Sequence, residues 1–244
     1  MVISERIFTI RYMIIQIYAF TDPETANAAV DLGVNNIGFV AGRYGIVPGE
    51  LSFSEAREIA ASLPPRATSV AITMSEDIKE ILRMASEVKP NIVHISTDVD
   101  RVGVEVMREL RSRLDMDIRL MKAIPVGDES SIVVSQQFAE VSDLLLLDTK
   151  REGFPGVGAT GFTHDWDISR RIVESVAIPV IMAGGLTADN VGAAICEINP
   201  WGVDSNTSTN IPGSQVEKDL QRITAFVSAV HSIENVDEDG ELKV

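Results

Sequence analysis

The chain has 244 residues, of which 45% are hydrophobic and 23% are charged, an ordinary composition for a globular protein with a sizeable core. Its formal net charge of −15 argues against a nucleic-acid partner, because a phosphate backbone requires an excess of Lys and Arg. The single cysteine, Cys196, excludes an internal disulfide, and its helical spacing among apolar neighbours predicts a buried structural thiol.

Short apolar segments bounded by turn residues predict eight strands. They lie at residues 14–18, 36–41, 68–73, 91–95, 117–121, 143–147, 179–183 and 201–205. Strands this apolar are typical of a parallel sheet that is covered on both faces. Eight β-α units in about 230 residues predict an α/β fold, a closed (β/α)8 TIM barrel. A doubly wound open sheet is the alternative, but the G-x-G-x-x-G fingerprint after the first strand is absent.

Amphipathic segments between these strands carry helix start signals. The stretch Thr21-Asp22-Pro23-Glu24 offers a cap and a proline that a first helical turn tolerates. The pairs Ser52 with Glu55 and Ser214 with Glu217 both fit a capping box. Apolar residues recur at three- and four-residue spacing over residues 77–88, 104–114 and 218–230, which predicts helices there.

No linker or low-complexity block divides the chain, so we predict a single domain. We expect an N-terminal extension at residues 1–12, the barrel at residues 13–232 and an acidic tail at residues 233–244. No apolar run is long enough to span a membrane, and the first residues lack the features of a signal peptide, so we expect a cytoplasmic protein without a membrane partner. The histidines lie far apart in the chain, and we expect no metal and no cofactor.

Two loops near the C-terminus are typical of phosphate binding. Gly184 and Gly185 stand where an apolar strand passes into a helix, and glycines let backbone N–H groups approach an anion closely. A tight turn without a ligand explains two glycines equally well. TIM barrels often bind phosphate at the loops after strands 7 and 8, and Ser205, Asn206 and Thr207 lie at the end of the eighth predicted strand. The barrel therefore favours a phosphate site formed by both loops.

The order of the motifs resembles the phosphoribosylanthranilate isomerase family, from about Met13 to His231. The segments that carry the resemblance are ANAAVDLGVNNIGFV, LLLLDTK, GATGFTHDW, IPVIMAGGLTADNVGAAI, PWGVDSNT and IPGSQVEKD. The resemblance implies a (β/α)8 barrel that performs the Amadori rearrangement of tryptophan biosynthesis. It implies a phosphorylated small-molecule substrate, an N-linked ribose 5-phosphate that becomes a 1-deoxyribulose. We expect a monomer or a homodimer.

The resemblance also implies a catalytic acid and a catalytic base. In the family the acid that protonates the furanose oxygen is the Asp closing the sixth strand, here Asp148. Four leucines precede it, and partial desolvation raises the pKa of a carboxyl so that it holds a proton near neutrality. An Asp that only caps the next turn is the structural alternative. The family base, which takes the C2 proton, is a cysteine. Tyr18 lies at that position in this chain and is therefore the candidate base. A phenol with a pKa of about 10 is a poor base at neutral pH.

Three other residues near strand ends are candidates for substrate contacts. Arg43, in the loop GRYGIVPG, offers a cation. His94 could replace the missing base, or it points outward beneath a helix as a core or surface histidine. Lys122 could form a Schiff base with a ketose, although an electrostatic or structural role is simpler because the family commonly has a lysine there. His164 is expected to cap a helix.

The sequence leaves three functions open. The leading hypothesis is a phosphosugar isomerase of this family. The second is an isomerase or aldolase that acts on a different phosphorylated sugar with another base. The third is a catalytically degenerate barrel that binds a phosphometabolite or a protein partner.

Overall fold

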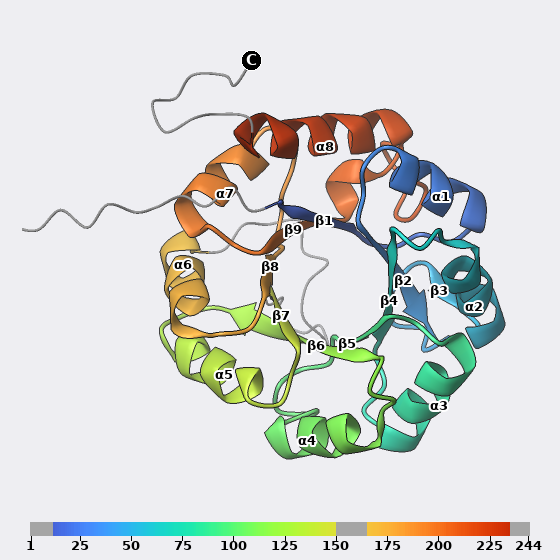
Figure 1. The fold of residues 1–244 in the computed structure, drawn as a ribbon, viewed down its shortest axis with the longest axis vertical. Coiled ribbons are helices and arrows are strands. Elements are labelled where there is room, and N and C mark those ends of the chain that lie inside the picture. The colour runs from blue at the N-terminus through green and yellow to red at the C-terminus, as the bar shows by residue number, and fades with distance from the viewer. Residues whose placement is uncertain (1–11, 150–164, 235–244) are drawn as a thin grey trace, which may run out of the picture.

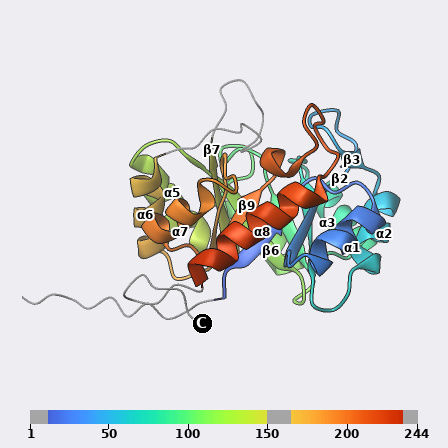
Figure 2. The same ribbon diagram turned by 90° about the horizontal axis from the view of Figure 1, so that it is seen from above.

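The computed structural model describes residues 12–149 and 165–234, which form a ring of parallel strands surrounded by helices (Figure 1). The barrel strands in these residues are β1 (Ile14–Ile17), β2 (Asn36–Ala41), β4 (Thr68–Thr73), β5 (Ile92–Ile95), β6 (Arg119–Val126), β7 (Leu144–Thr149), β8 (Val180–Met182) and β9 (Gly202–Ser205). The helices are α1 (Pro23–Asp31), α2 (Phe53–Ser62), α3 (Ile78–Val88), α4 (Val104–Arg113), α5 (Ser130–Ala139), α6 (Trp166–Ser175), α7 (Val191–Ile198) and α8 (Leu220–Glu234). Figure 2 shows α8 lying across the outside of the barrel.

The sheet closes on itself between its first and last barrel strands. The hydrogen-bonded order runs β1-β9-β8-β7-β6-β5-β4-β2, and β1 also pairs with β2. Gln16 on β1 is in register with Asn36 on β2 and with Asp204 on β9. The predicted (β/α)8 barrel in a single domain is therefore confirmed.

The strand boundaries differ from the prediction mainly at β6 and at a short additional strand. The pairing of β6 with β7 continues through Pro125, which is in register with Asp148. The pairing of β6 with β5 ends earlier, at Lys122. Beyond that point β6 has a neighbour on one side only, where a proline without an N–H is tolerated. The additional strand, β3 (Glu50–Leu51), pairs with β2 and was not predicted.

Alternating side chains along the strands separate two apolar layers. Leu145 and Leu147 of β7 face outward and pack with the helices in the large core, whereas Leu144 and Leu146 pack inside the barrel. This alternation decides which polar residues can reach the interior, because side chains two positions apart share one face.

The helix start signals were correct at two of the three positions. Asp22 caps α1 by accepting a hydrogen bond from the N–H of Thr25 at 2.7 Å, and Pro23 occupies the first turn. The capping box of Ser52 at α2 is present. The box predicted at Ser214 is wrong as a helix start. Its hydroxyl does accept from the N–H of Glu217 at 2.9 Å, but α8 begins only at Leu220.

The prediction that Cys196 is buried is also wrong, because its side chain is exposed on α7. The buried face of this helix consists of Val191, Ala194, Ile195 and Ile198, at the spacing of one helix face. Cys196 is the next residue around the helix after Ile195 and lies beyond that face.

The remaining predictions on organisation concern segments that the structure describes only in part. The extension at residues 1–12 and the tail at residues 233–244 fall almost entirely outside the described residues, and so does His164. None of the described helices combines the length and apolar character that crossing a membrane requires.

Candidate active site

A cavity of about 450 Å³ lies at the C-terminal ends of the barrel strands, where TIM-barrel enzymes carry out their chemistry. Its described lining falls into two sides. Asp148 of β7, together with Asp204, Asn206 and Thr207 of β9 and its following loop, forms a polar side. The opposite side is largely apolar and comes from β1, β2, β4 and the loop after β2, with Tyr18 and His94 at its base.

Asp148 is placed in the cavity by the alternation along β7. It continues the inward-facing row of Leu144 and Leu146 and lines the cavity. Burial raises the pKa of Asp148 to about 7, opposed by the N–H of Thr149, which donates a hydrogen bond to the carboxylate at 2.6 Å. A carboxyl with this pKa holds a proton for part of the time at neutral pH and can act as an acid.

Asp204 is a second carboxyl in the cavity, and the sequence analysis did not identify it. It is 6% exposed, and burial raises its pKa to about 8, with the negative charge of Asp148 adding to the shift. Gln16 Nε2 donates a hydrogen bond to Asp204 Oδ1 at 3.1 Å, and Asn36 Nδ2 donates to Gln16 Oε1 at 3.1 Å. An acidic residue inside a predicted barrel strand was the signal that could have revealed it.

Tyr18 and His94 form a hydrogen-bonded pair across the base of the cavity. The Tyr18 hydroxyl lies 2.5 Å from His94 Nδ1. Burial, with a contribution from Asp204, holds the Tyr18 pKa well above its usual value, while burial, with the charge of Lys122, lowers the His94 pKa to about 3. The imidazole is therefore neutral. Nδ1 is the one hydrogen-bond partner described for the protonated Tyr18 hydroxyl, which assigns the phenol as the donor of this hydrogen bond and Nδ1 as its acceptor. His94 does face the cavity, and the outward alternative is excluded.

The Tyr18 ring fits only because β2 carries a glycine beneath it. A Cβ at Gly38 would lie 2.2 Å from a ring carbon of Tyr18, far inside van der Waals contact. Gly38 therefore provides the space in which the tyrosine lies, and the tyrosine fills the interior at this level of the barrel.

The apolar side of the cavity includes Ile46, Val47 and Pro48, in the loop between β2 and β3. The Glu50 carboxylate shapes this loop, because it accepts hydrogen bonds from the backbone N–H groups of Gly45, Ile46 and Val47 at 2.6, 2.7 and 3.0 Å. These bonds lower the Glu50 pKa against the opposing effect of its partial burial. The loop is thus fixed by its own residues before any ligand binds.

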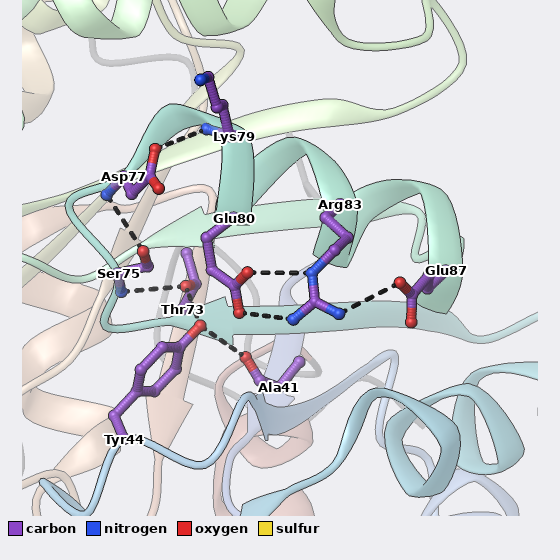
Figure 3. A network of polar contacts seen from close by, with 9 residues as sticks. All are labelled: Ala41, Tyr44, Thr73, Ser75, Asp77, Lys79, Glu80, Arg83 and Glu87. Carbon is purple, nitrogen blue, oxygen red and sulfur yellow. Dashed lines mark hydrogen bonds and ion pairs between the residues drawn. The ribbon is translucent and has the colours of Figure 1, made fainter.

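Tyr44 fastens the same loop to the end of β4 (Figure 3). Its hydroxyl lies 2.9 Å from Thr73 Oγ1 and donates to the carbonyl of Ala41 at 3.3 Å. Thr73 Oγ1 also accepts from the N–H of Ser75 at 3.1 Å, and the Ser75 hydroxyl accepts from the N–H of Asp77, the cap of α3. A single run of hydrogen bonds therefore joins the loop, the strand end and the helix start.

The two predicted phosphate loops lie side by side after β8 and β9. Gly184 and Gly185 have φ values of +87° and +63°, a region that favours glycine. Ser205 Oγ donates to the carbonyl of Leu186 at 3.1 Å and so joins the loops. Within the described residues, the backbone N–H groups of the two glycines and of Asn206 and Thr207 donate no hydrogen bond. Asn206 and Thr207 line the cavity, and the other three predicted residues are not among the lining residues described.

The structure does not bring Arg43 and Lys122 into the cavity. The Arg43 guanidinium is exposed and contacts the Glu55 carboxylate at 2.7 and 2.9 Å. Lys122 faces outward, between Met121 and Ala123, which face the interior. Its ammonium donates to the carbonyls of Ile95 and Thr97 beside the Phe138 ring, and burial lowers its pKa to about 7.

The family model and the relatives described next carry the name of one activity. The family model for N-(5'phosphoribosyl)anthranilate (PRA) isomerase matches residues 15–229. An N-(5'-phosphoribosyl)anthranilate isomerase from Haloferax volcanii is 32% identical over 228 residues, which cover 93% of this chain and 97% of that protein. The chain belongs to the phosphoribosylanthranilate isomerase family. A second such isomerase, from Methanosarcina mazei, is 35% identical over 204 residues, which cover 84% of this chain and 88% of that protein.

Solved structures of phosphoribosylanthranilate isomerases share the fold. The enzyme from Thermotoga maritima superposes with a TM-score of 0.76 at 26% identity, over 90% of this chain and 99% of that one. Another isomerase structure, in complex with reduced 1-(o-carboxyphenylamino)-1-deoxyribulose 5-phosphate, gives a TM-score of 0.74 at 24% identity, with the same coverage.

Proposed function

We propose that the chain is an intramolecular isomerase that converts N-(5'-phosphoribosyl)anthranilate into 1-(o-carboxyphenylamino)-1-deoxyribulose 5-phosphate, a step of tryptophan biosynthesis. The observation that carries the proposal is the Asp148 carboxyl, which lines the cavity beside loops with free backbone N–H groups. Family membership over residues 15–229 supports it. The proposal places the enzyme in the cytoplasm as a monomer or homodimer.

Asp148 is the general acid in this proposal. Its pKa of about 7 lets a fraction of the molecules hold the proton that the furanose oxygen must receive for ring opening. The carboxyl lies at the C-terminal end of β7, on the side of the cavity next to the two loops.

The loops after β8 and β9 hold the substrate phosphate. The backbone N–H groups of Gly184, Gly185, Asn206 and Thr207 are unengaged in the described structure, and such groups bind dianions well. Ser205 keeps the two loops together through the Leu186 carbonyl. With the phosphate held there, the anthranilate ring would rest on the apolar wall of Ile46, Val47 and Pro48, above Tyr18 and His94.

Turnover of phosphoribosylanthranilate by the purified protein tests the proposal. Product is quantified by chromatography for the wild type, for Asp148→Asn and for a matched control, Asp117→Asn, an exposed carboxyl before β6. We expect the wild type and the control to turn over equally and Asp148→Asn to lose about 10²–10⁴-fold in kcat, the usual contribution of a general acid. A wild type without turnover, or Asp148→Asn with full turnover, would refute the proposal.

A second candidate is favoured by one feature of the cavity. None of its described lining residues is Arg or Lys, although anthranilate carries a carboxylate. An isomerase for a phosphorylated sugar that bears an uncharged group in this place would suit such a wall. Turnover of the aniline analogue as fast as phosphoribosylanthranilate would favour this candidate, and a tenfold or larger preference for anthranilate would reject it.

A further inference from the structure

The rearrangement needs a base as well as an acid, and the residue at the family's base position is unsuited to that role. Tyr18 already uses its O–H to donate a hydrogen bond to His94 Nδ1 at 2.5 Å. It is buried beside Asp204, and both burial and that neighbouring charge oppose its ionisation. The phenol is thus held in its protonated form, in which it cannot remove a proton from carbon.

His94 is unsuited for a different reason. Its Nδ1, the lone-pair nitrogen of the neutral ring, is occupied by the Tyr18 hydroxyl. Its other ring nitrogen, Nε2, then carries the hydrogen, and this atom is fully buried without a hydrogen-bond partner among the described residues. His94 therefore offers no free basic site to a substrate in the cavity.

Asp204 has the surroundings that a carboxylate base requires. Asn36 Nδ2 donates to Gln16 Oε1, which turns the Gln16 amide so that its Nε2 donates to Asp204. A donor in this place stabilises the ionised form of a carboxyl. The charge of Lys218, whose ammonium is held by Asn206 and Asn210, acts in the same direction.

Asp148 and Asp204 also influence each other's ionisation. They lie on β7 and β9, on either side of β8, and line the same cavity. Each carboxylate disfavours ionisation of the other, so the pair tends to hold one proton between them. That proton can lie on either carboxyl, because the pKa of Asp148 is raised to about 7 and that of Asp204 to about 8. The reactive form is the one in which Asp148 holds the proton and Asp204 is ionised. A pair with one proton presents an acid and a base to the same ligand.

We propose that Asp204 is the general base of the reaction and that Asp148 and Asp204 together perform its proton transfers. This inference rests on the proposed function. Asp148 gives its proton to the ring oxygen as the C1–O bond breaks and a C1=N iminium ion forms. Asp204 then takes the proton from C2, and the electrons of that C–H bond form the C1=C2 bond of an enolamine.

The proton count closes within the pair. When the enolamine becomes the ketose, C1 gains a proton and the C2 hydroxyl loses one, so the substrate is isomerised without a net change in protons. After the first steps Asp148 is ionised and Asp204 is protonated. Transfer of one proton from Asp204 to Asp148, directly or through solvent, restores the starting enzyme.

The test compares variants at the two positions with substrate that carries deuterium at ribose C2. We expect Asp204→Asn to lower kcat by about 10²–10⁴-fold, as removal of a general base does. It should still bind the reduced product analogue within threefold of the wild type, which shows an intact fold and site. Asp204→Glu should recover part of the lost rate with a larger deuterium isotope effect. Tyr18→Phe should keep at least a tenth of the wild-type kcat.

The outcomes separate the two proposals. An active wild type with Asp204→Asn within tenfold of it would overturn the base assignment and leave the isomerase function intact. A loss in Tyr18→Phe as large as in Asp204→Asn would also overturn it, because the phenol would then share the base role. A wild type that does not turn over the substrate would overturn the isomerase function, and the base assignment with it.

Discussion

The two sides of the cavity treat their polar groups in opposite ways. On the side of β7 to β9, the carboxyls of Asp148 and Asp204 line the cavity with one described hydrogen-bond donor each and keep lone pairs for a ligand. The backbone N–H groups of Asn206 and Thr207 on this side donate no bond within the described residues. On the side of β1 to β5, most of the polar groups bond to one another, as in the pair of Tyr18 with His94 and the bonds of Tyr44 and Glu50, and His94 Nε2 is the exception. Unpaired groups can act on a ligand, whereas paired groups define shape. The comparison assigns chemistry to one side and fit to the other.

The largest expected effect that sharpens this comparison is an opposite response of the two sides to pH. The pKa of Asp204 is raised to about 8 in the folded state, so the folded protein binds more protons than the unfolded chain between about pH 4 and pH 8. Stability from this group is fully present below that window and is lost as pH rises through it. The stability difference between Asp204→Asn and the wild type should therefore shift in favour of the variant by roughly 2–5 kcal/mol from pH 5 to pH 9.

His94 should show the reverse. Its pKa is lowered to about 3, so the unfolded chain binds more protons below about pH 6.5, and stability from His94 is lost as pH falls. Thermal unfolding of Asp204→Asn, His94→Asn and the exposed control Asp117→Asn at pH 4, 5, 7 and 9 measures both signs. A parallel pH profile for all three would contradict the assigned protonation states.

The next largest effect is expected from a substitution in the phosphate loop after β8, on the polar side of the cavity. Gly184 has a φ of +87°, which a β-branched residue adopts only with strain, so Gly184→Val should displace the loop and its N–H groups. Lost hydrogen bonds to a charged phosphate cost about 1.5–3 kcal/mol, or about a ten- to hundredfold rise in KM. Gly127→Ala is the matched control, because a Cβ there meets no atom within 4 Å. An unchanged KM in Gly184→Val would place the phosphate elsewhere.

The smallest effect concerns the apolar side. Tyr44→Phe removes the hydroxyl that joins the β2–β3 loop to Thr73 and Ala41. The loop retains the three bonds to Glu50, so we expect a loss of about 1 kcal/mol in stability and a rise of less than about tenfold in KM, with kcat retained. Urea unfolding and steady-state kinetics measure both. A large fall in kcat would show that this side also carries chemistry.

The same division explains how much the sequence could predict. The barrel was predictable because apolar runs separated by helix start signals are local patterns. Asp148 was predicted through the family resemblance, since four leucines in a row do not show on which face of the strand the next side chain lies. The glycine loop was predictable because backbone conformation restricts residue choice. The Tyr18–His94 pair was not, because it joins residues 76 positions apart and depends on the space that Gly38 leaves.

Other differences have equally local causes. Asp204 lies in the segment GVDS, inside the strand predicted at residues 201–205, but the sequence alone did not show that its side chain reaches the cavity. Ser214 and Glu217 make the first bond of a capping box, but the Asn210–Lys218 bridge diverts the chain before a helix can begin. Arg43 and Lys122 lie close in sequence to the ends of barrel strands. Their side chains point away from the cavity, and the sequence does not show this direction.

The pairing of β1 with both β2 and β9 has a consequence for assembly. The amides of Gln16 and Asn36 and the Asp204 carboxyl meet only across this seam, where the start of the chain joins its final strand. A nascent chain or a fragment that lacks β9 contains the proton donor Asp148 but not the proton acceptor Asp204. Enzymatic turnover would then report completion of the ring, and a split version of the chain could serve as a sensor for the reunion of its halves.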